Sequence, residues 1–115
     1  MSPRTGGKGP GRSRCRRKVG FLPDVTTFKP LGVPMMELDT VIITHEELEA
    51  MRLVDYLGMD QESASDRMGI SRRSFAGDLK SGRKKIISAF VDGKAVNIEG
   101  GDFTYRRESK FKEEE

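Results

Sequence analysis

The stretch that decides the fold is residues 61–85, which read QESASDRMGISRRSFAGDLKSGRKK. Residues 61–68 predict a short helix that stops at Gly69, where glycine can adopt the left-handed conformation of a tight turn. Ser71 can cap the next helix, placed at 71–92, by accepting a hydrogen bond from an early backbone N–H. Two helices joined by a glycine-bearing turn form the helix-turn-helix pattern.

The longer helix is expected to have two chemically different faces. Four apolar side chains recur at helical spacing and are expected to pack: Phe75, Leu79, Ile86 and Phe90. Another face is basic around a glycine, with Arg73, Gly77, Lys80 and Lys84. We therefore expect one face to join the core and the other to meet a polyanion.

A further helix is predicted upstream at 45–57. Thr44 and Glu47 have the capping-box spacing, so the helix is expected to begin at His45 and to end at Gly58. The neighbouring acids Glu46 and Glu49, like Glu47, are assigned to capping and to the helix dipole, not to catalysis. Its apolar stripe is Leu48, Met51, Val54 and Leu57, with Leu53 beside it.

The remaining chain is expected to add little to the core. Residues 1–18 read as a flexible basic arm, 19–101 as the helix-turn-helix domain and 102–115 as a polar tail. Three prolines favour extended chain over 19–36, and residues 94–98, KAVNI, predict a short strand. Apolar side chains before the first helix are expected to pack on the helices: Phe21, Val25, Phe28, Leu31, Val33, Met35 and Met36. The predicted fold class is mainly α, a three-helix core with a short extended N-terminal segment and a short C-terminal strand.

Composition limits the classes of function that the sequence favours. The 115 residues allow one small core, which argues against an enzyme with a deep cleft. No apolar run suits a membrane span or a secretory signal, so the protein is expected to be cytoplasmic. Cys15 is the only cysteine, and neither it nor His45 has partners at metal-ligand spacing, so we expect no metal site and no cofactor.

Charge is unevenly distributed along the chain. The net charge is +3, yet residues 37–66 hold nine acids against Arg52 alone, while residues 69–85 hold six basic residues and one acid. This asymmetry indicates one surface that faces a polyanion and another that faces away. Such a surface suits duplex DNA, but the same charge pattern also occurs in proteins that bind RNA.

The second helix of this motif places its first residues against base edges in the major groove. The base-edge candidates are Ser71, Arg72, Arg73 and Ser74. The phosphate candidates are Lys80, Arg83, Lys84 and Lys85. The basic arm is a candidate for the adjacent minor groove, and a homodimer on two half-sites is the default expectation.

At these residues the chain resembles a known family. The stretches FKPLGVP, THEELEAMRLVD, RMGISRRSF and DGKAVNIEGG, within residues 14–101, are similar to the prokaryotic proteins grouped as domain of unknown function 134. The resemblance implies a DNA-binding protein with a helix-turn-helix similar to region 4 of sigma factors. Three positions depart from the family pattern: Ser65, Gly77 and Asp78.

Two other functions remain open from the sequence. One is an RNA-binding or ribosome-associated module, although no aromatic stacking platform is evident. The other is a protein-interaction module that uses the acidic first helix, with the transcription machinery as partner. A redox switch at Cys15, whose thiol lies beside two arginines, is a separate hypothesis.

Overall fold

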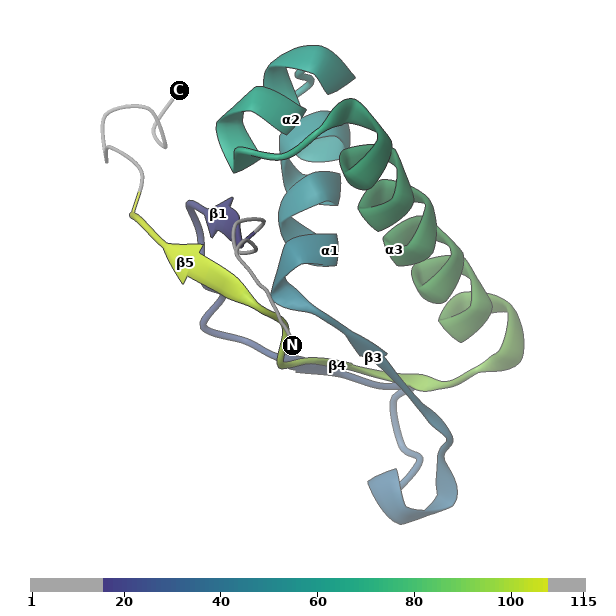
Figure 1. The fold of residues 1–115 in the computed structure, drawn as a ribbon. Coiled ribbons are helices and arrows are strands. Elements are labelled where there is room, and N and C mark those ends of the chain that lie inside the picture. Colours follow the sequence, from purple (N-terminus) through teal and green to yellow (C-terminus); the bar gives the residue numbers. More distant parts are fainter. Residues whose placement is uncertain (1–15, 108–115) are drawn as a thin grey trace, which may run out of the picture.

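The computed structural model describes residues 16–107 as three helices and two small sheets (Figure 1). The helical segments are η2 (Met35–Glu37, a 3-10 turn), α1 (His45–Met51), η3 (Arg52–Tyr56, a π-helix that continues α1), α2 (Gln61–Met68) and α3 (Arg72–Asp92). The strands are β1 (Arg17–Val19), β2 (Thr27–Phe28), β3 (Thr40–Ile43), β4 (Ala95–Ile98) and β5 (Phe103–Tyr105). Helices account for about half of the described residues, which agrees with a helical core.

The three predicted helices are confirmed. They could be predicted because local sequence signals set their ends. Thr44 and Glu47 form both bonds of the capping box at the start of α1. Gly69 adopts the left-handed conformation, with φ 73°, directly after α2. Ser71 is the N-cap of α3, and Gly93 ends that helix in the left-handed region.

The strands form two sheets that the sequence predicted only in part. β4, predicted from KAVNI, is the centre of a three-stranded sheet, antiparallel to β2 and parallel to β3. β1 and β5 form a separate parallel pair in which Arg17 lies opposite Phe103. The expectation of a frayed tail from residue 102 is therefore wrong for β5, and Lys18, which we placed in the flexible arm, lies in β1.

Two core clusters lie along α3. Its N-terminal half packs Phe75 and Leu79 against Leu53 of η3 and Met68 of α2. The C-terminal half packs Ala89 against the sheet, which supplies the buried residues Ile43, Val96 and Ile98. Figure 1 shows the same division, with α2 near one end of α3 and the sheet near the other. α3 is therefore held along its whole length.

Several expected core residues lie at the surface instead. Phe90 is 75% exposed, because the packed face of α3 passes through Ile86 and Ala89, and Phe90 falls one position outside it. The apolar residues of the N-terminal segment are also mostly outside the core, since β2 pairs over only two residues at the edge of the sheet. The exposed ones are Phe21, Val25, Phe28, Leu31, Met35 and Met36.

α1 and α3 approach closely at Gly82, which is buried. A Cβ atom at this position would lie 2.8 Å from Met51 Cε and 3.2 Å from Glu47 Cβ. Gly77, five residues earlier on the same helix, is exposed, and a Cβ there would meet nothing within 4 Å. Glycine therefore weakens helix propensity at both positions, but only at Gly82 would a side chain meet close neighbours.

These two glycines give a matched pair of substitutions. Gly82→Leu should lower the free energy of unfolding by about 1–3 kcal/mol, because the side chain overpacks the α1–α3 contact. Gly77→Leu should raise it by about 0.5–1 kcal/mol through helix propensity alone. Urea unfolding of both variants measures the difference. Equal effects of the two changes would contradict the close contact.

Candidate nucleic-acid interface

Three capping interactions set the two ends of α2 and the start of α3. Asp60 caps α2 by accepting the Ser63 N–H at 2.7 Å, and Gly69 reverses the chain after the last turn. Ser71 then accepts the Ser74 N–H at 3.0 Å and donates its hydroxyl to Ser74 Oγ at 3.1 Å. The link between the two helices is thereby fixed by the local backbone.

Packing fixes how α3 leaves this corner. Ala64 and Met68 of α2 are fully buried against Phe75 and Leu79 of α3. Ser65, a departure from the family pattern, is 1% exposed, and its hydroxyl donates to the Glu62 carbonyl at 2.9 Å. The buried hydroxyl is therefore satisfied, so it does not disturb the contact between the helices.

The outward face of α3 carries most of the predicted basic residues. Its exposed members are Arg72, Arg73, Gly77, Lys80 and Lys84, with Ser71 and Ser74 at the N-terminal end. Arg73, Lys80 and Lys84 form no ion pair with any other described residue. Their charges are therefore presented to solvent on one side of one helix.

Arg83 lies at the edge of this face and is already paired. Its guanidinium donates to the two carboxylate oxygens of Asp55 at 2.6 and 3.1 Å. The hydrogen bonds from Arg83 hold the pKa of Asp55 below its usual range, and the same contacts raise the pKa of Arg83. Both side chains are nearly half exposed, so water screens the pair and a phosphate can compete for the guanidinium.

Lys85 points away from the outward face. Its ammonium donates to Glu47 Oε1 at 2.9 Å and to the Ile42 carbonyl at 2.8 Å. Ser81 of α3 also donates to the Glu47 carboxylate. Lys85 therefore joins α3 to α1 and β3, and the structure does not bring it together with the other phosphate candidates.

Glu47 is the centre of this internal network. Burial alone would raise its pKa, but the hydrogen bonds from Ser81, Lys85 and the Thr44 N–H outweigh burial and hold the pKa below the ordinary value of 4.5. The carboxylate thus remains charged while it links α1 to α3. It caps α1, as the sequence predicted, and also binds α3, which no local pattern indicated.

Asp78 of α3 pairs with Arg17 of β1. It is one of the three residues that depart from the family pattern. Arg17 donates to its two carboxylate oxygens at 3.1 and 3.3 Å. Both side chains are largely buried. The carboxylate is therefore compensated, and the pair attaches the start of the described chain to the middle of α3.

Glu49 has a different role from the one predicted. It is 1% exposed and accepts two hydrogen bonds from Arg52 at 2.9 and 3.0 Å and one from the Gly20 N–H at 3.0 Å. Glu46 likewise accepts the Asp102 N–H at 3.1 Å. Assignment of both to the helix dipole was therefore incomplete, because each holds a distant segment against α1.

Lys18, a basic residue near the turn between α2 and α3, was not among the DNA-binding candidates predicted from the sequence. Its alkyl chain lies 3.5 to 3.9 Å from the position that a Cβ of Gly69 would occupy. The residue is exposed and lies in β1, so its ammonium is carried beside the α2–α3 turn. A contact between segments this far apart in sequence leaves no local signal.

Several features predicted from the sequence lie outside the described residues. Cys15, the redox hypothesis and most of the basic arm lie outside residues 16–107. Within that range, none of the helices combines the length and the apolar character needed to cross a membrane.

Comparison with known proteins identifies the family of this chain. Residues 4–106 match the family model described as "Protein of unknown function DUF134". The chain belongs to this family. A UPF0251 protein of Methanosarcina acetivorans is 50% identical over 104 residues, which cover 90% of this chain and 93% of the relative. A UPF0251 protein of Methanococcus vannielii is 47% identical over 97 residues, covering 84% of this chain and 75% of the relative. No solved structure matches the chain.

The Glu47 network predicts a pH-dependent stability. Because the folded-state pKa lies below 4.5, the network contributes stability that is present above about that pH and is lost as the pH falls through the folded-state pKa. Glu47→Gln should lower stability at neutral pH and flatten the acid limb of the unfolding curve. Urea titrations at several pH values measure this, with Glu99→Gln at an exposed site as the control. An unchanged acid limb in Glu47→Gln would refute the network.

Proposed function

We propose that the protein binds double-stranded DNA in a sequence-specific way, through a helix-turn-helix formed by α2 and α3, and acts as a transcriptional regulator. The observation that carries the proposal is the outward basic face of α3, which begins at the Ser71 cap and has no ion pair at Arg73, Lys80 or Lys84 within the described chain. A function of this kind places the protein with the chromosome, in the cytoplasm of a prokaryotic cell.

The order of chemistry along α3 supports this proposal. Arg72 and Arg73 stand in the first turn, where a major-groove helix meets base edges, and a guanidinium can donate two bonds to guanine. Lys80 and Lys84 follow on the same side, where phosphates of the groove wall would lie. Gly77, between them, adds no side chain and allows a close approach of the backbone to the nucleic acid.

The buried polar contacts support the same assignment. The acids of α1 are used inside the fold: Glu47 binds Lys85, and Glu49 binds Arg52. Fewer α1 carboxylates are therefore free to bind a protein partner than the sequence suggested, which weakens the hypothesis of a protein-interaction module. The base-edge candidates, by contrast, lie at the surface of a helix that its core contacts hold in place.

The first experiment compares the loss of one positive charge at two places on the protein. Arg73→Ala should raise the Kd for a specific duplex by about 5- to 150-fold, the equivalent of about 1–3 kcal/mol for a bidentate base contact. Lys29→Ala, at an exposed residue directly after β2 and outside α2 and α3, removes a charge as a control. Fluorescence anisotropy measures both.

The pattern of loss separates the roles of Arg73. A loss confined to the preferred sequence indicates a base contact, whereas a uniform loss across sequences assigns the residue to phosphate. Structured RNA serves as competitor in the same assay. Displacement of duplex DNA by RNA at lower concentration than by duplex competitor would overturn the proposal in favour of an RNA-binding module.

Two adjacent lysines give a second test. Lys84→Met should weaken duplex binding and reduce the salt slope by about 1, because one phosphate contact is lost, with little effect on unfolding. Lys85→Met should instead lower the free energy of unfolding by about 1–2 kcal/mol through the lost bonds to Glu47 and Ile42, and leave the salt slope unchanged. The reverse assignment of effects would contradict the proposed interface.

A further inference from the structure

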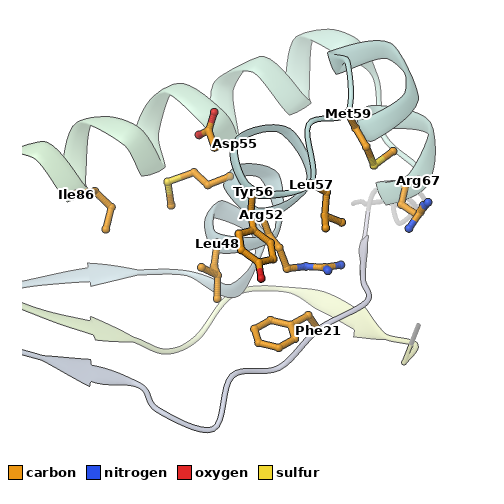
Figure 2. Close-up of a pocket in the computed structure, with 10 residues that line it drawn as sticks. Phe21, Leu48, Arg52, Asp55, Tyr56, Leu57, Met59, Arg67 and Ile86 are labelled. Atoms are coloured by element: carbon orange, nitrogen blue, oxygen red, sulfur yellow. The ribbon is translucent and has the colours of Figure 1, made fainter. Parts of the chain in front are cut away.

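A groove of about 780 Å³ lies beside η3 (Figure 2). Most of its lining is apolar, and part of that lining is left accessible to water: Tyr56 is 82% exposed, Leu57 45% and Phe21 39%. Sites for small molecules have volumes of about 300–1,000 Å³ and are mostly apolar with a few polar groups. The groove therefore has the size and the character of a binding site for a small organic molecule.

One wall of the groove is a turn of π-helix. Arg52, Asp55 and Tyr56 line the groove, and all three belong to η3. The Leu57 N–H donates to the Arg52 carbonyl at 2.9 Å, which is the hydrogen-bond spacing of a π-helix. Single turns of π-helix are rare in proteins and occur frequently at functional sites. The backbone of η3 therefore marks the groove as a site independently of its apolar lining.

The charged residues of the groove favour an anionic ligand. Figure 2 shows the side chains of Arg52 and Arg67 toward one end of the groove and Ile86 toward the other. Asp55, the acid among the lining residues, already accepts two hydrogen bonds from Arg83. A carboxylate would therefore meet guanidinium groups at one end, whereas a cation would have to compete with Arg83 for Asp55.

The same end of the groove presents flat groups to a ligand. The Arg52 guanidinium is held by Glu49 at 2.9 and 3.0 Å and lies 5.4 Å from the centre of the Phe21 ring. Tyr56 adds a second aromatic ring to the lining (Figure 2). Aromatic rings pack favourably on other aromatic rings and on guanidinium planes. A flat aromatic body suits this lining better than a branched aliphatic one.

We propose that the groove binds a small aromatic carboxylate, which acts as an effector that weakens DNA binding. The aromatic body packs against Phe21 and Tyr56, and the carboxylate lies toward Arg52 and Arg67. Occupation of the groove is independent of DNA. The effector role rests on the DNA-binding function proposed above.

Asp55 links the groove to the basic face of α3. It lines the groove and also binds Arg83, one of the phosphate candidates. Both side chains of this pair are nearly half exposed, so water now weakens their attraction. A ligand in the groove removes water from Asp55, which strengthens its bonds to Arg83 and leaves the guanidinium less available to a phosphate. The duplex should weaken ligand binding by the same factor.

The first test titrates the full chain with cinnamate and, separately, with cinnamamide, which has the same ring but no charge. Calorimetry should show a saturable cinnamate site with a Kd at least about tenfold lower than that for cinnamamide, because only the carboxylate forms charge-assisted hydrogen bonds. Amide NMR shifts should be largest in residues 48–59. Absence of saturation, equal affinity for the two compounds or larger shifts elsewhere would overturn the proposed site. Shifts of residues 48–59 on concentrating the chain alone would assign the groove to a second copy instead.

Two substitutions locate the ligand within the groove. Tyr56→Ala should raise the cinnamate Kd by about 2- to 12-fold through the lost ring contact. Tyr105→Ala, at an exposed tyrosine outside the lining, should leave the Kd unchanged. Arg67→Met should weaken cinnamate binding but not cinnamamide binding, because it removes charge from one end of the groove. Equal effects of the two tyrosine changes, or equal losses for the two compounds in Arg67→Met, would contradict the proposed position of the ligand.

The effector role is measured separately, by fluorescence anisotropy of a duplex in the presence of saturating cinnamate. The duplex Kd should rise by about fivefold or more, and the rise should disappear in Asp55→Asn, which breaks the pair with Arg83. Cinnamate binding by a chain that binds no duplex would refute DNA binding and leave the ligand site intact. A duplex Kd that cinnamate does not change would refute the effector role and leave DNA binding intact.

Discussion

The close contact between α1 and α3 at Gly82 is the constraint on which the rest of the structure depends. The absence of a side chain at Gly82 leaves room for Met51 and Glu47 to lie directly against α3. At that distance Glu47, which also caps its own helix, can bind Ser81 and pair with Lys85, which in turn bonds to the β3 carbonyl of Ile42. This carboxylate and the buried side chains Phe75, Leu79 and Ala89 together fix the rotation of α3 about its axis, and that rotation decides which cations face the solvent.

The charged residues divide into those that hold the fold and those that face outward. Arg17 binds Asp78 and so joins β1 to α3, whereas Arg52 binds the buried Glu49 within the continuous helix of α1 and η3. Buried pairs of this kind add little net stability, but the loss of one partner is costly because it leaves an unpaired charge. Arg73, Lys80 and Lys84 form no ion pair with another residue of 16–107, and this supports the proposal that they contact an external polyanion.

The helices could be predicted from the sequence because their limits are local. The capping box at Thr44, the glycine turn at Gly69 and the cap at Ser71 each involve residues within a few positions of one another. The strands β1 and β5 could not be predicted, since each is stabilised by a segment more than eighty residues away. Long-range contacts also limited the prediction of the site. The sequence indicated that all the basic residues of 69–85 face a polyanion, but only the contact with Glu47 shows that Lys85 faces inward.

The most direct test of the central claim is selection of bound sequences from a random duplex pool at moderate salt, with full-length protein. The account predicts enrichment of a defined motif, and loss of that enrichment when Arg72 and Arg73 are both changed to alanine. If the bound sequences stay as random as the starting pool, or if the double variant selects the same motif as the wild type, α3 is not a helix that reads DNA.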